Sequence, residues 1–161
     1  HGGSLRFTSG HAGAAESSPA VKTLLVEEQA WGVDRSESYR AFAHRVEDLK
    51  AALRARLAEW KGQGKRIAAY GASAKGSTLL NYFGIGRETL DFVVDRSIYK
   101  QGRFTPGTHL PIRRTEQLLE AMPDYVLLLT WNFADEILAQ QAEYRRRGGK
   151  FVIPIPQVQV A

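Results

Sequence analysis

The stretch from Arg66 to Phe83 constrains the fold more than any other part of the chain. Ile67-Ala-Ala-Tyr70 is a short apolar run typical of a buried strand, and Gly71 can take the backbone angles that a sharp exit from a strand needs. A helix-forming run follows, in which Gly76 would let the helix pack closely on the strand. The residues predict a strand, a glycine-bearing turn and a helix, the phosphate-binding unit of many α/β proteins.

The start of this helix favours an anion. Its first N–H groups have no intrahelical acceptor, the helix dipole is positive there, and Lys75 adds a full charge. The dinucleotide fingerprint carries three glycines, but here Ser73 replaces the middle one, which lets a pyrophosphate touch the backbone. The spacing therefore leaves two interpretations open: a phosphate or nucleotide site, or a tight turn without a ligand.

Three more apolar runs predict strands, and helix-forming segments separate them. The predicted strands are Leu90–Val94, Tyr125–Leu129 and Phe151–Ile153, and the predicted helices include Thr115–Ala121 and Phe133–Arg147, the latter with Asn132 as N-cap. Strands joined through helices require right-handed crossovers and a parallel sheet. We therefore expect an α/β fold, a Rossmann-like three-layer sandwich with a mostly parallel sheet of about four to five strands.

A long amphipathic helix precedes the sheet. Asp34 and Glu37 have the spacing of a capping box, and an apolar stripe extends behind them over residues 36–62: Tyr39, Phe42, Val46, Leu49, Leu53, Leu57 and Trp60. The stripe either packs on the following domain or binds a partner or a second copy. Residues 1–33 read as a tail of an upstream domain with a linker helix, and 34–161 as the Rossmann-like domain. The first residue is His rather than Met, which is typical of a fragment.

Polar residues follow the predicted strands where parallel sheets bind ligands. Asp95 is placed to accept from a ribose hydroxyl, or equally to cap its loop against Arg96 or Lys100. Three stretches are expected to converge on one crevice: Gly71–Gly76, Asp95–Lys100 and Trp131–Asn132.

Composition excludes several classes of protein. The chain has no cysteine, which excludes disulfides and thiolate metal sites and favours the cytoplasm, and its four histidines show no metal-binding spacing. The net charge is +5, but the basic residues are spread among acids without interleaved aromatics, so we expect no nucleic-acid partner. No apolar run approaches the roughly 20 residues that span a bilayer, so we expect no membrane association.

Several motifs, in this order, resemble a known family. They are His1–Arg6, Tyr70-Gly-Ala-x-Ala-Lys-Gly-x-Thr-Leu-Leu-Asn81, Val94-Asp95 through Lys100-Gln101, Thr105-Pro-Gly-Thr-His109 with Pro111, and Trp131-Asn132-x-Ala-Asp-Glu-Ile137. Together they are similar to the C-terminal domain of S-adenosylmethionine-dependent sugar C-methyltransferases, which act on nucleotide-linked deoxysugars. Ser77 departs from the family, in which Asn is expected.

The resemblance implies a three-part enzyme: a zinc-binding segment, a methyl-donor domain, and this domain, which holds the nucleotide-diphosphate sugar in deoxysugar biosynthesis. S-adenosylmethionine and zinc are expected in the parts that lie upstream, and no cofactor in this fragment. We therefore expect the fragment to lack methyl transfer and to contain no catalytic residue, although His1 could lie near the reaction site. Its partners would be the sugar nucleotide and the upstream methyl-donor domain of the same chain.

The resemblance also suggests the residues that bind the substrate. Gly71, Ser73, Lys75 and Gly76 would contact the anion. Asp95, Lys100 and Gln101 would contact the ribose or the base, and the crevice would be lined by Thr108, His109, Trp131 and Asn132. Two alternatives stay open: an NAD(P)-binding module of an oxidoreductase, disfavoured by Ser73, and a non-catalytic structural or dimerisation domain.

Overall fold

A computed structural model describes residues 4–14 and 16–161 of the chain. The chain divides into two compact units, one ending at Asp48 and one from Leu49 to Ala161. His1 and the two residues after it lie outside the described residues, so the predictions made on them stay predictions.

The described part of the first unit is helical. Helix α1 (Pro19–Trp31) ends at Gly32, whose N–H donates to the carbonyls of Glu28 and Gln29. Helix α2 (Ser36–Gly62) begins in this unit and ends in the second. The expected capping box is wrong, because Asp34 lies two positions before the first residue of α2 and its carboxylate faces Arg35 at 4.0 Å.

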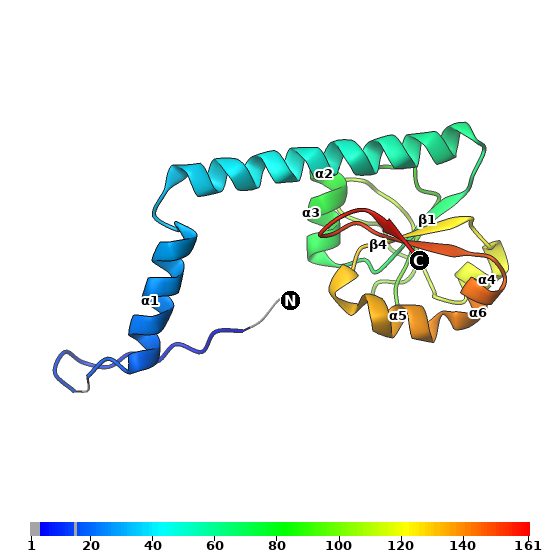
Figure 1. Cartoon of the computed structure of the whole chain (residues 1–161). Helices are drawn as coiled ribbons and strands as arrows, with labels where there is room; N and C mark the ends of the chain where they lie inside the picture. Colours follow the sequence, from blue (N-terminus) through cyan, green and yellow to red (C-terminus); the bar gives the residue numbers. More distant parts are fainter. Residues whose placement is uncertain (1–3, 15) are drawn as a thin grey trace. The chain divides into compact units, whose positions relative to one another are not determined.

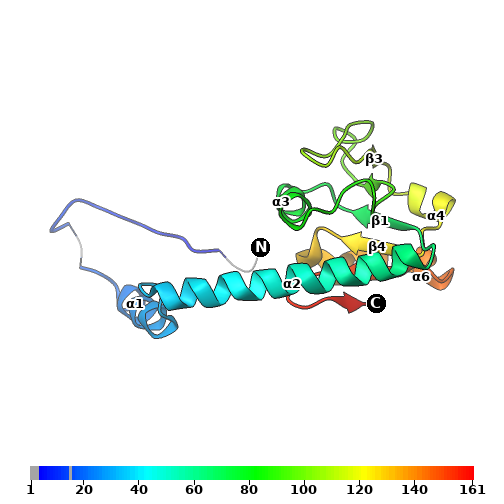
Figure 2. The same cartoon turned by 90° about the horizontal axis from the view of Figure 1, so that it is seen from above.

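The second unit is built on a six-stranded sheet with the order β3-β2-β1-β4-β5-β6. Its strands are β1 (Ile67–Tyr70), β2 (Val93–Val94), β3 (Ile112–Arg113), β4 (Tyr125–Leu128), β5 (Lys150–Ile153) and β6 (Gln159–Val160). Strands β1 to β5 pair in parallel, and β6 joins β5 in the antiparallel direction. Figure 2 shows β3, β1 and β4 in this order across the sheet, with β1 beside β4. The predicted α/β fold with a mostly parallel sheet is confirmed, and β6 is the strand that the pattern did not reveal.

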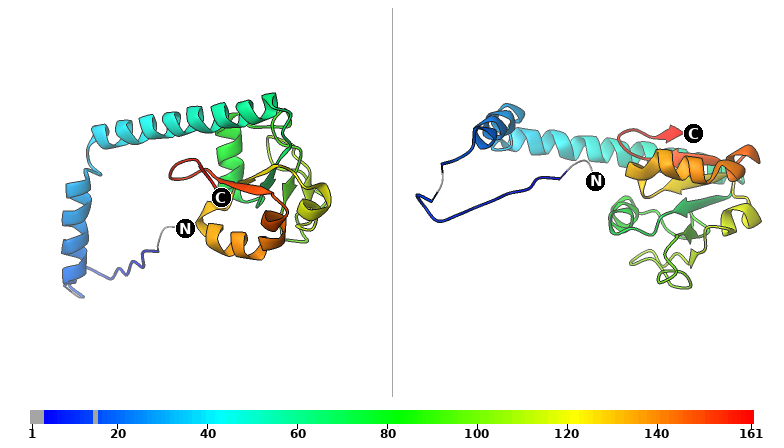
Figure 3. Two further views of the ribbon diagram at one scale, coloured as in Figure 1. Left: turned by 45° about the vertical axis from the view of Figure 1, so that its right-hand side comes forward. Right: turned by 90° about the horizontal axis from the view of Figure 1, so that it is seen from below.

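Helices cover both faces of the sheet (Figures 1 and 3). The chain moves from β1 to β2 in one direction and from β4 to β5 in the other, so right-handed crossovers place the connecting helices on opposite faces. One face carries α3 (Ala74–Phe83) and the second half of α2; the other carries α5 (Ala134–Gln140) and α6 (Ala142–Arg146), with α4 (Gln117–Ala121) beside them.

The core follows the alternation of side chains along β1. Ala68 and Tyr70 point to the α5 and α6 face, where they join Val126, Leu128, Ile137, Tyr144 and Phe151 in one buried cluster. On the other face the ring of Trp60 stacks on that of Tyr125, with centroids 3.8 Å apart.

The apolar stripe of α2 divides into two halves. Leu53, Leu57 and Trp60 are buried, and burying such side chains contributes about 1.5–3 kcal/mol each. Tyr39 and Phe42, in the first half, are exposed by 55% and 58%. The prediction that the stripe packs on the following domain is therefore confirmed for the second half of the helix.

One predicted helix is interrupted. Residues 133–147 form two helices, because Gln141 leaves helical geometry with φ −100° and ψ 27°. Asn132 is not the N-cap of α5, since it lies inside the 3₁₀ turn η1 (Trp131–Phe133). Its side chain has another partner, described below.

Candidate functional site

The exit from β1 is a tight turn that only glycine fits. Gly71 has φ 91°, in the left-handed region that side chains rarely adopt. A Cβ built on it would lie 2.6 Å from Cγ2 of Thr130, the second residue after the end of β4. The Gly71 N–H donates to the carbonyl of Val94 at 2.7 Å, which ties the turn to the end of β2. The carboxyl ends of β1, β2 and β4 therefore meet at this glycine.

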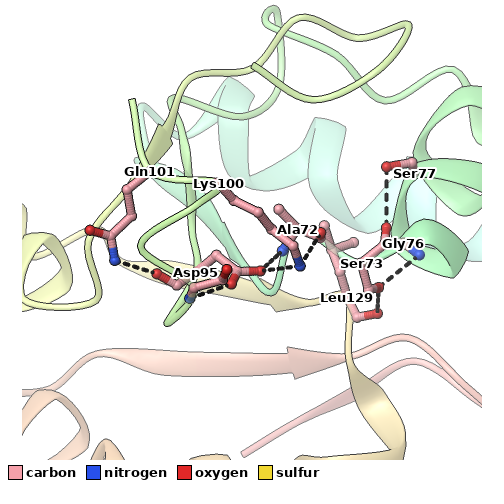
Figure 4. A network of polar contacts seen from close by, with 9 residues as sticks. Ala72, Ser73, Gly76, Ser77, Asp95, Lys100, Gln101 and Leu129 are labelled. Atoms are coloured by element: carbon pink, nitrogen blue, oxygen red, sulfur yellow. Dashed lines mark hydrogen bonds and ion pairs between the residues drawn. The ribbon is translucent and has the colours of Figure 1, made fainter. Parts of the chain in front are cut away.

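Ser73, the departure from the dinucleotide fingerprint, caps helix α3. Its Oγ accepts from the N–H of Gly76 at 3.0 Å and donates to the carbonyl of Leu129 at 3.2 Å (Figure 4). A Cβ on Gly76 would lie 2.7 Å from Cβ of Leu129, so this glycine permits a close approach of α3 to the residue that follows β4, and not to β1 as expected. The N–H groups of Ala74 and Lys75 stand in the same first turn, where a helix offers them no acceptor.

Asp95 joins the loop after β2 to the Gly71 turn (Figure 4). Oδ2 accepts from Ala72 N at 2.8 Å and from Lys100 Nζ at 3.2 Å, and Oδ1 accepts from Ser97 N at 2.8 Å. Lys100 also donates to the carbonyl of Ala72, and Gln101 to that of Asp95. Of the two roles left open for Asp95, the structure shows the loop-capping contact with Lys100. Because a carboxylate has about four acceptor positions, one remains for a further donor.

Lys75 lies between two residues of η1. Its ammonium donates to Oδ1 of Asn132 and sits 4.5 Å from the ring centroid of Trp131. Loss of hydration lowers the pKa of Lys75 below its ordinary value. An anion at the adjacent helix terminus would compensate for this lost hydration.

A cavity of about 240 Å³ opens beside the Gly71 turn, on the α5 face of the sheet. It is lined by Tyr70, Gly71, Asp95, Arg96, Thr130, Phe133, Glu136 and Ile137. Arg96 pairs with Glu136 at 3.2 Å.

Two of the residues that line this cavity, Tyr70 and Thr130, carry buried hydroxyl groups. Among the described residues, Tyr70 Oη and Thr130 Oγ1 are buried without a hydrogen-bond partner. The side chain of Gln141 lies near enough to Tyr70 to influence its pKa, yet no hydrogen bond of normal geometry forms. Burial raises the pKa of Tyr70 above its ordinary value of 10.0, so the hydroxyl keeps its proton and can donate at neutral pH.

The structure brings most of the predicted site residues together and leaves two apart. Gly71, Ser73, Lys75, Gly76, Asp95, Lys100, Gln101, Trp131 and Asn132 gather at the carboxyl edge of the sheet. Thr108 and His109 line a different hollow with Arg87 and Phe104. Their loop lies beside the C-terminal half of α3, where Asn81 donates to the carbonyl of Pro106 and Arg87 to that of His109.

Sequence reasoning missed the residues of the cavity wall, above all Tyr70, Thr130, Phe133 and Glu136. A usable signal existed for the first two, since a polar side chain at the carboxyl end of a buried strand stands where such sheets bind ligands. Phe133 and Glu136 gave no such signal, because aromatic and acidic residues are common near the start of a helix whether or not a ligand binds.

Within residues 4–14 and 16–161, no three His, Asp or Glu side chains gather in an arrangement that could hold a metal ion. In the same residues no helix combines the length and the apolar character needed to cross a bilayer.

A mostly parallel sheet with helices on both faces and a capped helix after its first strand defines a Rossmann-like α/β domain. Residues 1–156 match the model of a family described as the C-methyltransferase C-terminal domain. The chain is also 40% identical over 161 residues to the C-methyltransferase NovU of Streptomyces niveus, which covers 99% of this chain. The chain belongs to the family of C-methyltransferase C-terminal domains.

The chain spans 38% of the length of that curated relative. A solved structure, UDP-D-quinovosamine 4-dehydrogenase from Vibrio fischeri, aligns with a TM-score of 0.43 and 18% identity over 60% of this chain and 93% of that one.

Proposed function

We propose that this domain binds the diphosphate of a nucleotide-linked sugar at the N-terminus of α3, as the substrate-holding part of a sugar C-methyltransferase. The observation that carries the proposal is the position of Lys75, whose ammonium is held by Asn132 and the ring of Trp131 beside the first turn of the helix. A lysine fixed in this way adds a full charge where the helix dipole already favours an anion.

The backbone supplies further donors for the diphosphate. Ser73 occupies the N–H of Gly76, so the N–H groups of Ala74 and Lys75 are the ones that contact the phosphate oxygens. Helix α3 has ten residues, long enough to develop a dipole at its terminus.

Asp95 and Lys100 form the ribose side of the proposed site. The remaining acceptor position of Asp95 lies on Oδ1, because Oδ2 already accepts two donors. A ribose hydroxyl is the donor that this position suits, as in other sheets with an acid after the second strand. Gln101 supports the group by donating to the backbone of Asp95.

The methylating chemistry belongs to the rest of the full-length protein in this proposal. The family described above is a C-terminal domain, and the chain spans 38% of its curated relative. S-adenosylmethionine and a structural zinc ion would be bound upstream, and the domain alone would transfer no methyl group. The lack of cysteine in this chain is consistent with a cytoplasmic protein.

The test is the affinity of the full-length protein for nucleoside diphosphates and their sugars, measured by titration calorimetry. Removing a charge-assisted hydrogen bond costs about 1.5–3 kcal/mol, so Lys75→Ala should weaken binding by about tenfold or more. Lys150→Ala is the matched control, because it removes the same charge from the opposite edge of the sheet, at the start of β5. An unchanged affinity in Lys75→Ala would show that the assignment is wrong.

A further inference from the structure

The first unit of the chain has almost no interior. Among its described residues, 4–14 and 16–48, Gly32 is the only one that is buried. Helix α1 has 13 residues and buries none of them. A helix of this length is marginal in water by itself, because most helical stability in proteins comes from packing an amphipathic face on another surface. The helices of this unit therefore need a further surface to cover them.

Large apolar side chains mark the side of each helix that needs this cover. On α1, Val21, Leu24 and Trp31 recur at intervals of three and seven residues, the spacing of one helix face, and Trp31 is exposed by 69%. On α2, the exposed Tyr39 and Phe42 begin the same stripe whose second half packs on the sheet. The first half of the stripe has the same apolar character without the packing.

Hydrogen bonds hold the turn between the two helices in place. Tyr39 Oη donates to the carbonyl of Val33 at 2.7 Å, and Ser38 Oγ donates to that of Trp31 at 3.3 Å. Gly32 has φ 82°, and a Cβ built on it would lie 2.7 Å from Ser38 Oγ. The Tyr39 hydroxyl keeps its partner when the ring is covered, so covering the ring leaves no unsatisfied polar group. Side chains fixed in advance also lose less entropy on docking.

A second copy and a lipid surface both fit these side chains poorly. Within the first unit the stripe of α2 extends over residues 36–48, fewer than two heptads, whereas a coiled coil is built on three to four or more. A helix that lies on a membrane has a polar face rich in Lys and Arg. Helix α1 carries two glutamates and a single lysine.

We propose that Trp31, Tyr39 and Phe42 anchor this unit on the part of the full-length protein that precedes this chain. The family is a C-terminal domain and the chain spans 38% of its curated relative, so more than half of that protein lies outside the chain. Trp and Tyr dominate the binding energy of interfaces, and the surface that receives them is an apolar groove. The inference rests on the proposed function, in which the preceding part carries the methylating chemistry.

The test is hydrogen exchange of the full-length protein, followed by mass spectrometry. Amides of residues 19–31 and 36–48 should be protected in the wild type. Phe42→Gln and Trp31→Gln should each lower this protection by about tenfold or more, because they remove a large apolar side chain from the docked face. Gln favours a helix at least as well as Phe or Trp, so helix propensity does not account for a loss. Unchanged amides in residues 67–153 would show that the sheet stays folded.

The matched control is His44→Gln, which introduces the same side chain on the opposite, exposed side of α2 and should exchange like the wild type. Two further measurements separate docking within one chain from pairing of two copies. The wild-type protection should not change over about a hundredfold dilution, and light scattering should give Phe42→Gln the mass of the wild type.

Three results would overturn the inference. If residues 19–48 exchange in the wild type as fast as an unfolded chain, nothing covers them. If they are protected but Phe42→Gln and Trp31→Gln exchange like the wild type, these side chains are not the anchors. If protection falls on dilution, or Phe42→Gln halves the mass, a second copy covers the stripe.

None of these measurements uses a ligand. The diphosphate site at α3 therefore stands when this inference fails, and an unchanged affinity in Lys75→Ala would refute that site without altering the exchange result.

Discussion

The polar side chains at the two ends of the sheet differ in whether they have hydrogen-bond partners. At the amino end, Asp124 accepts from the N–H of Arg66 at 2.9 Å and from Lys65 at 3.1 Å, while Asp91 accepts from Arg66 Nε at 3.2 Å. Tyr144 also finds its acceptor near this end, at Pro123. At the carboxyl end, Tyr70 and Thr130 have no partner among the described residues.

The difference agrees with the end of the sheet at which we propose a ligand site. Both ends belong to one sheet and one buried cluster, so the fold itself does not dictate unsatisfied hydroxyls. Proteins satisfy nearly all buried polar groups, and exceptions collect where a ligand completes the bonding. The amino end therefore satisfies these polar groups within the protein, and the carboxyl end is where we propose that a ligand binds.

The largest effect on stability is expected for a glycine with positive φ at the carboxyl end of the sheet, compared with one at the amino end. Gly71→Ala should lower the free energy of unfolding by about 3 kcal/mol, of which about 1 is backbone strain and about 2 comes from the clash with Thr130. Gly64 lies just before β1 with φ 75° and nothing within 4 Å of a built Cβ, so Gly64→Ala should cost only about 1 kcal/mol. Urea denaturation of both variants checks this, and equal losses would contradict the tight fit at Gly71.

The next effect contrasts the two buried tyrosines. Tyr144→Phe leaves the carbonyl of Pro123 without its donor and should cost about 1–3 kcal/mol of unfolding free energy. Tyr70→Phe removes a hydroxyl that has no partner and should cost nothing or stabilise the protein. Chemical denaturation without ligand measures both variants. A loss in Tyr70→Phe as large as in Tyr144→Phe would mean that the protein itself satisfies the Tyr70 hydroxyl.

The smallest effect is a pH dependence at the amino end. The backbone N–H of Arg66, and then Lys65, lowers the pKa of Asp124 below its ordinary value of 3.8. A carboxyl with a lowered pKa in the folded state stabilises the protein above the unfolded pKa, and that contribution disappears as pH falls through the folded pKa. Asp124 is 38% exposed, so we expect less than about 1 kcal/mol.

Unfolding free energies measured between pH 6 and the lowest pH at which the protein stays folded, about pH 3, test this contribution. Asp124→Asn should show a shallower loss below about pH 4 than the wild type. Asp34→Asn, which replaces a carboxylate that is 64% exposed, is the control and should follow the wild type. If the unfolding free energy of Asp124→Asn falls with pH as steeply as that of the wild type, Asp124 does not contribute to the loss of stability in acid.

Local patterns predicted the elements of the fold well. The apolar run at Ile67–Tyr70 and the long helix over residues 36–62 both depend on neighbouring residues, and the structure confirms them. The resemblance in the motifs predicted the family, which the match over residues 1–156 confirms. Three local predictions failed: Asn132 contacts Lys75 instead of capping α5, Gln141 divides a helix that looked continuous, and Asp34 lies too far from α2 to cap it.

The sequence by itself determined the order of strands and helices, the glycine turn after β1 and the cation beside it, because backbone preferences and apolar periodicity act over a few residues. Only the tertiary structure decided that the hydroxyls of Tyr70 and Thr130 would be buried without partners among the described residues, and that Thr108 and His109 would line a separate hollow. The physical reason is that hydrogen-bond satisfaction depends on which distant atoms come within about 3 Å, and strand pairing sets those distances.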